Sequence, residues 1–336
     1  MPQKPSPPRT PSASPARNGS HPDRLPAAYP ARRATKATAN ALREKSPGPK
    51  TPKQADLWPL KEAQPFLKWA GGKSQLLEQF EPFFPDSIGS YLEPFLGGGA
   101  VFFHLKARFP AMRARLRDVN PELINCYTVV RDAVEKLMDQ LDLHSEKFRA
   151  EGKNHYYQVR SRHRIEDPVE RAARMIFLNK TCFNGLWRVN SRGEFNVPIG
   201  SNHSDKILYR RQNLLAASRA LQGVDLAVED FRDALGSAKS GDFVYVDPPY
   251  VPLSRTASFT SYTREEFGQD EQEKLAELFA EAAARGARLM LSNSDTPFIR
   301  QRYQAFKLHT VKARRAVNSD GAKRGLISEV LALSYR

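Results

Sequence analysis

Apolar and polar residues alternate along this chain in a rhythm typical of an α/β sheet. From about residue 64 onward, short apolar runs of strand length are separated by longer stretches with helical periodicity. Strands that alternate with helices favour a mainly parallel sheet covered by helices. The predicted strands cover residues 90–95, 114–120, 225–231, 242–247, 287–293 and 328–335.

Two predicted helices carry recognisable start signals. Pro121 opens a helix over residues 121–141, because proline is well tolerated in the first helical turn. Thr263 and Glu266 have the spacing of a capping box, which predicts the start of a helix that runs through Ala284.

Between Asp142 and Val224 the alternation of strands and helices stops. This stretch contains helical segments, such as residues 168–180, followed by "NGLWRVNSRGEFNVPIG" at residues 184–200. In that segment two strand-like runs flank Ser-Arg-Gly, which predicts a β-hairpin with glycine at its turn. The pattern therefore predicts a mostly helical insertion that contains a hairpin.

The N-terminal stretch differs from the rest in composition. The first 60 residues hold 13 of the 25 prolines and no phenylalanine. Such a composition cannot bury enough apolar surface to offset the entropy lost on ordering, so we predict a disordered tail. The predicted parts of the chain are this tail at 1–60, an α/β core at 64–142 and 224–336, and the insertion at 143–223.

Positive charge is concentrated in two places along the chain. The net charge is +15, and residues 1–60 carry 11 Lys/Arg against 3 Asp/Glu. Residues 145–225 carry 15 against 8, whereas the remainder balances at 26 of each sign. Clustered charge of this kind is expected of a protein that binds a polyanion, nucleic acid first, although a solvated basic face is the alternative.

Several protein classes are disfavoured by the sequence. Cys126 and Cys182, 56 residues apart, provide neither a disulfide framework nor a metal-binding spacing. No apolar run reaches the ~18 residues of a membrane span. The N-terminus lacks the apolar segment of a secretion signal. We therefore expect no metal and no membrane attachment.

A glycine-rich turn follows the first predicted strand, in "EPFLGGGAVFF" at residues 93–103. Glycines at a strand-to-helix turn let a ligand approach the backbone, and the helix start offers free N–H groups. Asp118 ends the next predicted strand, where an acid accepts hydrogen bonds from ribose hydroxyls. These two features suggest an adenosine-containing cofactor, with ordinary tight turns as the alternative.

The segment "FLKWAGGK" at residues 66–73 is ambiguous by itself. The letters "GGKS" at 71–74 match the end of a phosphate-binding loop, but the first glycine of that motif is missing. The pattern alone indicates a loop with a buried tryptophan.

The segment "GDFVYVDPPYVP" at residues 241–252 ends an apolar strand with two prolines, which cannot continue a sheet ladder. Methylation of an exocyclic base amine needs acceptors for its two N–H groups, so that the nitrogen lone pair faces the methyl donor. The Asp247 carboxylate and the Pro248 carbonyl can be these acceptors on a rigid loop. Tyr250 can stack on a base flipped from a duplex. A plain strand stop is the alternative.

These segments together resemble the Dam-type (α-group, D12 class) DNA adenine N6-methyltransferases. The resemblance covers roughly residues 64–336. It is carried, in this order, by "FLKWAGGK", "YLEPFLGGGAVFF", "RDVNPELINCY", "CFNGLWRVNSRGEFNVPIG" and "VYVDPPY". It implies a Rossmann-like methyltransferase core that uses S-adenosylmethionine (SAM), with the insertion as target-recognition domain. The implied reaction methylates adenine N6 in double-stranded DNA by base flipping and direct in-line attack.

The resemblance also assigns roles to individual residues. Those implied for catalysis are Asp247, Pro248, Pro249 and Tyr250. Those implied for binding SAM are Trp69, Lys73, Glu93, Pro94, Phe95, Gly97, Gly99, Asp118, Asp230, Phe231 and Asp247. Candidates for DNA contacts are Asn184, Arg188, Asn190, Arg192, Arg314 and Arg324. Arginine can read guanine and asparagine can read adenine, but a phosphate contact or a solvated side chain is the alternative for each.

The segment "GSNHSDKILYRR" at residues 200–211 departs from the aromatic- and lysine-rich run usual in the family. GATC is the first expectation for the target, and this departure leaves the recognised sequence open. We expect a monomer, bacterial or phage-encoded, in the cytoplasm or nucleoid. A partner restriction endonuclease at the same site is compatible with the resemblance.

Three other functions stay open from the residues alone. One is methylation of RNA or of a protein glutamine, although such enzymes often carry Asn at the position of Asp247 and many lack a basic insertion. The second is methylation of cytosine N4, whose amine geometry is similar. The third is a catalytically inactive DNA-binding protein, which the intact motifs disfavour.

Overall fold

The computed structural model describes residues 63–201, 208–250, 267–314 and 326–335. The predicted tail, the capping box of Thr263 and Glu266, and Arg324 lie outside the described residues. For Arg314 only the backbone is described.

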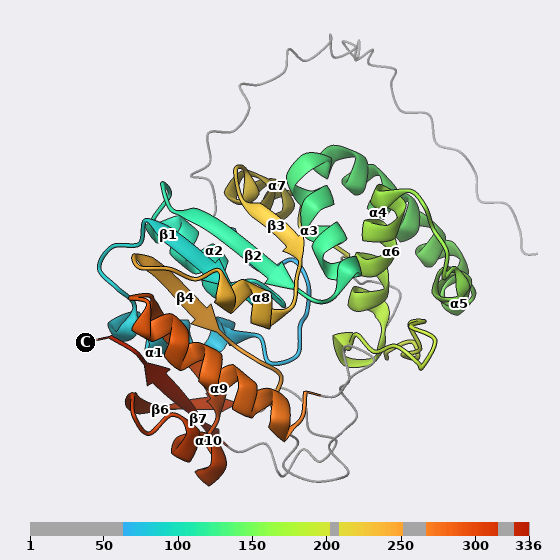
Figure 1. The fold of residues 1–336 in the computed structure, drawn as a ribbon. Helices are drawn as coiled ribbons and strands as arrows, with labels where there is room; N and C mark the ends of the chain where they lie inside the picture. The colour runs from blue at the N-terminus through green and yellow to red at the C-terminus, as the bar shows by residue number, and fades with distance from the viewer. Residues whose placement is uncertain (1–62, 202–207, 251–266, 315–325, 336) are drawn as a thin grey trace, which may run out of the picture. The chain divides into compact units, whose positions relative to one another are not determined.

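A seven-stranded sheet forms the centre of the molecule, in the order β3-β2-β1-β4-β5-β7-β6 (Figure 1). The strands are β1 (Ser90–Glu93), β2 (Arg113–Asp118), β3 (Asp225–Val228), β4 (Asp242–Val246), β5 (Arg288–Ser294), β6 (Lys307–Arg314) and β7 (Leu326–Leu333). The pairs among β1 to β5 are parallel, whereas β7 runs antiparallel to both β5 and β6. This arrangement confirms the predicted α/β, Rossmann-like fold and all six predicted strands.

Strand β6 was not predicted. It is an edge strand with "KLHTVKAR" as its sequence, and only Val311 and Ala313 of its described side chains are buried. Charged residues on an edge strand keep it from pairing with other chains, and they also hide the apolar alternation that marks a strand.

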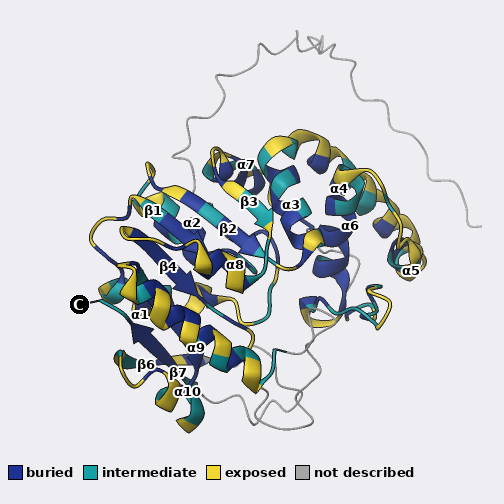
Figure 2. Ribbon diagram, in the orientation of Figure 1, coloured by how far each residue is buried: buried dark blue, intermediate teal, exposed yellow. Residues whose placement is uncertain are grey.

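Helices cover both faces of the sheet, because consecutive strand residues point to opposite sides. Tyr91 and Tyr245 face one apolar cluster, and Leu92 and Val246 face the other. The first cluster is covered by α2 (Ala100–Arg108), α3 (Pro121–Asp132) and α7 (Arg211–Leu221). The second is covered by α8 (Phe231–Gly236), α9 (Gln269–Ala284) and α10 (Pro297–Arg302). Figure 2 shows β4 as buried along its length, whereas β3 at the edge of the sheet carries exposed residues.

The prediction of one helix over residues 121–141 was wrong. The chain breaks at Ala133, where φ is −144°, and continues as α4 (Val134–Glu151). Both helices pack on α6 (Pro168–Thr181), and α3 also packs on strands β2 and β3, so the break lets α4 leave the sheet while it stays against α6. Helix α4 also runs through residue 142, where the sequence pattern changes.

Residues 143–223 contain the second half of α4, then α5 (Lys153–Ser161), α6 and α7, so this stretch is mainly helical. Asp167 caps α6 by accepting a hydrogen bond from the Glu170 amide at 2.8 Å. The hairpin is short, with an antiparallel bridge between Val189 and Phe195 and a second between Cys182 and Ile199. Among the described helices, none has the length and apolar character needed to span a membrane.

Candidate active site

The candidate site lies at the carboxyl ends of three neighbouring parallel strands. Strand β1 lies between β2 and β4, and these strands end at Glu93, Asp118 and Val246. Ligands of open α/β sheets bind outside such strand ends. The fold therefore brings the glycine turn, Asp118 and the Asp-Pro-Pro-Tyr loop to one edge.

The glycine turn is shaped by close contacts. Gly97 has φ of 48° and Gly99 has φ of 66°, the left-handed region that glycine adopts readily. A Cβ atom at Gly97 would lie 2.8 Å from Trp69 Cδ1, and one at Gly99 would lie 2.7 Å from the Tyr127 hydroxyl oxygen. The turn thus has no room for side chains, and Trp69 packs directly against it.

Asp118 closes the turn from the next strand. Its Oδ2 accepts a hydrogen bond from the Gly97 amide at 3.1 Å, and its Oδ1 accepts one from the Asn120 amide at 3.0 Å. Burial raises the pKa of Asp118 to about 6, although both amide bonds oppose this change. Each carboxylate oxygen keeps a further lone pair for a ligand.

Asn120 is a site residue that the sequence reasoning missed. Its Oδ1 caps α3 by accepting hydrogen bonds from the Glu122 and Leu123 amides. Its buried Nδ2 has no hydrogen-bond partner within the described residues. A buried donor normally has a partner, so this atom is suited to a polar ligand at the turn.

The segment around Asp230 and Phe231 is held mostly by its own local contacts. Asp230 caps α8 by accepting from the Arg232 amide at 2.9 Å, and it also pairs with the Arg232 guanidinium at 3.0 Å. Phe231 stacks on Phe95 with ring centroids 5.4 Å apart. Phe267 contacts both rings, so the three phenylalanines form an aromatic cluster just beyond the end of β1.

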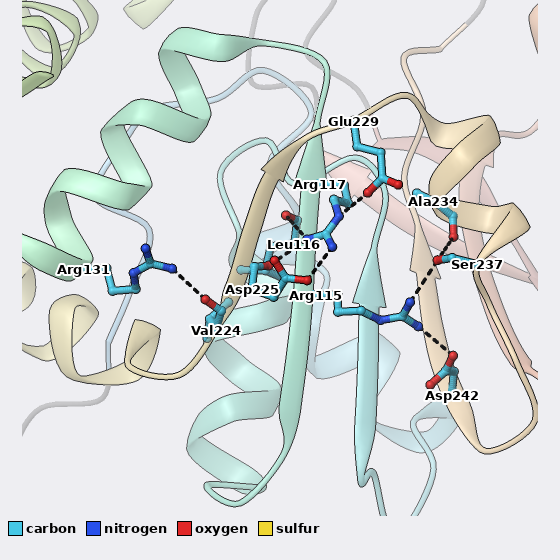
Figure 3. A network of polar contacts seen from close by, with 10 residues as sticks. All are labelled: Arg115, Leu116, Arg117, Arg131, Val224, Asp225, Glu229, Ala234, Ser237 and Asp242. Carbon is cyan, nitrogen blue, oxygen red and sulfur yellow. Dashed lines mark hydrogen bonds and ion pairs between the residues drawn. The ribbon is translucent and has the colours of Figure 1, made fainter.

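An ion-pair network supports this edge of the sheet (Figure 3). Arg117 on β2 pairs with Glu229, the residue before Asp230, and with Asp225 Oδ2 at 2.6 Å. Arg117 therefore holds the loop after β3 against β2. The sequence reasoning missed this role, since a strand arginine gives no local signal of its partner.

A lysine links the glycine-containing segment at residues 66–73 to the Asp-Pro-Pro-Tyr loop. Lys73, at the start of the short helix η1 (Lys73–Gln75), places its Nζ 2.9 Å from Asp247 Oδ1. The same nitrogen donates to the Gly71 carbonyl at 2.7 Å and lies 4.8 Å from the Tyr250 ring centre. The predicted residues Lys73, Asp247 and Tyr250 are therefore brought together.

A second carboxylate stands in this cluster. Oε2 of Glu329, on β7, accepts a hydrogen bond from the Tyr250 hydroxyl at 2.7 Å and one from the Ser292 hydroxyl at 3.0 Å. It lies 3.8 Å from Lys73 Nζ. Sequence reasoning read Glu329 only as part of a strand. A charged residue inside an apolar strand was the available signal, because buried charges are normally paired.

Two buried amide side chains, from α9 and β5, also hold the Asp-Pro-Pro-Tyr loop. Gln272 on α9 donates to the Pro249 carbonyl at 2.9 Å, and Asn293 on β5 donates to Gln272 Oε1 at 2.9 Å. Both amide side chains are fully buried. These two hydrogen bonds fix the backbone of Pro249 through side chains of α9 and β5.

The pKa values of the Asp247 and Glu93 carboxyl groups are raised above their usual range. The pKa of Asp247 is raised to about 6: burial raises it most, Lys73 lowers it, and the nearby Glu329 adds a smaller rise. The Asp247 side chain keeps 19% of its surface exposed, so a ligand can reach it. Burial raises the pKa of Glu93, next to the buried Pro94, well above its usual range, and Glu93 Oε2 accepts a hydrogen bond from the Tyr91 hydroxyl at 2.9 Å.

The predicted DNA contacts fall into two groups. Asn190 is committed to the hairpin turn: its Oδ1 accepts from the Arg192 and Glu194 amides, and its Nδ2 donates to the Glu194 carboxylate. Arg188 donates to Asn196 Oδ1 at 2.8 Å. In contrast, the Arg192 side chain is 79% exposed.

Asn184 lies in an unusual backbone conformation, with φ of 55°, the only non-glycine residue with positive φ among the described residues. Its neighbour Phe183 is 50% exposed, which the sequence reasoning did not single out. An exposed aromatic ring is a surface that can contact bases.

No group of three or more His, Cys, Asp or Glu side chains in the described part of the chain is placed to hold a metal ion.

The comparisons with known proteins identify the family of the chain. Residues 69–317 match the family described as D12 class N6 adenine-specific DNA methyltransferase. The chain is 42% identical to the type II methyltransferase M.MjaIII of Methanocaldococcus jannaschii, over 82% of this chain and all of that protein. It is 39% identical to the type II methyltransferase M1.LlaDCHI of Lactococcus lactis subsp. cremoris, over 81% of this chain and 95% of that protein. It is 37% identical to the DNA adenine methylase of Escherichia coli strain K12, over 82% and 96%. The chain therefore belongs to the D12 class of N6 adenine-specific DNA methyltransferases.

Proposed function

We propose that the enzyme transfers a methyl group from SAM to N6 of an adenine flipped out of duplex DNA. The observation that carries the proposal is the Asp247-Pro248-Pro249-Tyr250 loop, which stands beside the glycine turn with an accessible carboxylate and a fixed aromatic ring. We further propose that the enzyme acts as a monomer on DNA in a bacterial cytoplasm or nucleoid. GATC is the first candidate target.

The residues at the strand ends fit SAM. The glycine turn leaves bare backbone at Gly97 and Gly99, Asp118 has free acceptor capacity, and Asn120 offers an unpaired buried donor. Trp69 and the Phe95–Phe231 pair supply aromatic surface on either side. When bound, SAM supplies a sulfonium methyl group that passes directly to adenine N6, without a covalent enzyme intermediate.

The catalytic loop orients the amine. The Asp247 carboxylate accepts one N6–H and the Pro248 carbonyl accepts the other, so the nitrogen lone pair points away from both. The Tyr250 hydroxyl donates a hydrogen bond to Glu329, which fixes the orientation of the ring. The fixed ring then stacks on the flipped base. The buried amides of Gln272 and Asn293 hold the loop, so little reorganisation remains for the reaction step.

The recognition surface is proposed to lie on the insertion. Its hairpin exposes Arg192, and Phe183 with Asn184 forms an exposed corner next to it in sequence. Two of the relatives described above are type II methyltransferases, which supports a partner restriction endonuclease acting on the same site.

The deciding experiment uses methyl-labelled SAM with unmethylated duplex DNA and, separately, a structured RNA. Mass spectrometry identifies the modified nucleoside, and mapping of the label identifies the target sequence. N6-methyladenine in DNA is the expected product. Label in RNA alone, or N4-methylcytosine, would replace the proposal. SAM binding without label on any substrate would indicate an inactive DNA-binding protein.

The rate of methyl transfer is expected to fall below pH 6. The ionised carboxylate of Asp247 is a much stronger acceptor for an amine hydrogen than the protonated acid, and its pKa is about 6. The single-turnover rate should therefore be level above pH 7 and decrease about ten-fold per pH unit well below the pKa. Rates from pH 5 to 8 test this, with DNA affinity measured at each pH. A rate that stays level down to pH 5 contradicts the role of Asp247.

Two hairpin variants separate phosphate binding from turn structure. Arg192→Ala removes an exposed cation, so we expect weaker binding to all DNA sequences alike. The slope of log K against the logarithm of the salt concentration should also become smaller in magnitude by about one. Asn190→Ala removes three bonds of the turn and should weaken binding more. Fluorescence anisotropy over a salt series measures both. A loss for Arg192→Ala that depends on one base pair would instead indicate base readout.

A further inference from the structure

Glu329 is a buried carboxylate at the centre of the catalytic cluster, and the reaction as described needs it only to anchor Tyr250. Its side chain is 7% exposed. Strand β7 lies between β5 and β6 and pairs Glu329 with Ser294 on one side and Val311 on the other, so the position of its backbone is fixed. Removing such a charge from water is costly unless its partners are well placed.

Lys73 is shared between two carboxylates. Its Nζ lies 2.9 Å from Asp247 and 3.8 Å from Glu329. Charged N–H···O bonds are typically 2.7–2.9 Å long, so a movement of about 1 Å would carry the lysine from one partner to the other. In the arrangement seen here, Lys73 occupies the Asp247 oxygen Oδ1 and competes with any other donor for it.

We propose that Glu329 is a positioning residue for methyl transfer, which anchors the Tyr250 ring and gives Lys73 a second carboxylate so that Asp247 can turn to the adenine amine. This inference rests on the proposed function. Glu329 touches neither the base nor the methyl donor in this scheme. It acts through Lys73 and Tyr250.

The charges around Asp247 support this role. The groups that face it are Lys73 from η1, Glu93 and Tyr91 from β1, Tyr245 from β4, Tyr250 from the catalytic loop and Glu329 from β7. Burial raises the pKa of Glu93 and of each tyrosine well above its usual value. Burial is also the largest cause of the raised pKa of Asp247; among the neighbouring charges, Lys73 lowers this pKa and Glu329 raises it.

The test is Glu329→Gln, which removes the charge but keeps an oxygen acceptor for the Tyr250 and Ser292 hydroxyls. Lys73 then has Asp247 as its single carboxylate partner in the cluster. We expect the plateau single-turnover rate to fall about ten-fold or more, while DNA affinity changes less than about two-fold. The acid limb should move to lower pH by about one unit, because a like charge near Asp247 is gone.

A second readout needs no turnover. Carbon-13 labelling of aspartate carboxyls in the free full-length chain, with Asp247→Asn to assign the signal, follows the ionisation of Asp247 directly. Its pKa should be lower in Glu329→Gln than in the native enzyme. As a matched control, Glu277→Gln removes an exposed carboxylate of α9 that pairs with Lys274, and both rate and acid limb should stay native.

The possible outcomes distinguish a failure of the proposed function from a failure of the proposed role of Glu329. If the native enzyme makes no N6-methyladenine, the proposed function fails. If it does, and Glu329→Gln keeps the native rate and acid limb, the role of Glu329 is wrong. A lower rate with an unchanged pKa of Asp247 would show a merely structural role and also overturn the inference. If Glu329→Gln does not fold, Tyr250→Phe tests the anchor: native rate and affinity in that variant would overturn it.

Discussion

Replacing Asp247 with alanine is expected to abolish methyl transfer, lowering the single-turnover rate by about 10³-fold or more, while DNA binding persists. Asp247 is the only ionised acceptor that the proposed reaction places at the amine, and removal of one preorganised group at a reacting centre typically costs about 10²–10³ in rate. The estimate is at the upper end because Lys73 then stands next to the amine without its closest counterion. Rapid-quench assays and gel-shift titrations measure the two quantities.

A matched variant controls for lost stability. Asp242, at the other end of β4, is 1% exposed and pairs with Arg115 at 2.7 Å. Breaking a buried pair by removing one partner costs about 3–5 kcal/mol, so Asp242→Ala should destabilise the fold at least as much as Asp247→Ala. It should nevertheless keep methyl transfer at a temperature where both variants are folded. Turnover retained by Asp247→Ala would refute the catalytic assignment.

The sequence was informative where function depends on strand ends. Apolar runs located the six predicted strands, and the carboxyl ends of parallel strands meet at one edge of a sheet. Asp118 and Asp247 each follow such a run directly, and Gly97 follows another. Their proximity was therefore predictable from local pattern plus one general rule, and the structure confirms it by the Gly97–Asp118 bond.

The supporting residues could not be found in this way. Glu329 reaches Tyr250 because β7 inserts antiparallel between β5 and β6, a register that no local pattern specifies. Gln272 and Asn293 lie on a helix and a strand whose packing brings them under Pro249. Contacts between distant segments depend on how the elements pack, and a single sequence holds little information on that.

Local chemistry also changed the reading of two predicted site residues. Asn190 was predicted to contact DNA, but its side chain makes three bonds within the hairpin turn. Asp230 was predicted to bind SAM, and its side chain caps α8 and pairs with Arg232. Asparagine and aspartate favour turns and helix starts for the same reason that they suit ligands, since their short side chains reach nearby amides. Their direct ligand contacts remain predictions.

The second large effect is expected for Gly97→Ala, which should weaken SAM binding by about 100-fold. A left-handed backbone costs a non-glycine residue about 1–2 kcal/mol, and overpacking a filled site costs about 1–3 kcal/mol. At Gly97 both terms apply, because φ is 48° and the new Cβ atom would lie 2.8 Å from Trp69 Cδ1. Trp69 must move, and with it one wall of the proposed cofactor pocket. Isothermal titration with SAM gives the affinity, and tryptophan fluorescence reports the displacement.

Gly223→Ala is a control that introduces backbone strain without a steric clash, so it separates the two effects of Gly97→Ala. Gly223 has φ of 71°, and a Cβ atom there would meet nothing within 4 Å. Both variants therefore carry the same kind of backbone strain, and thermal unfolding should show a loss of stability in each. Only Gly97→Ala displaces Trp69 and strains the turn whose amide is bonded to Asp118. If Gly97→Ala binds SAM as tightly as Gly223→Ala does, the contact between Trp69 and the glycine turn does not form part of the cofactor site.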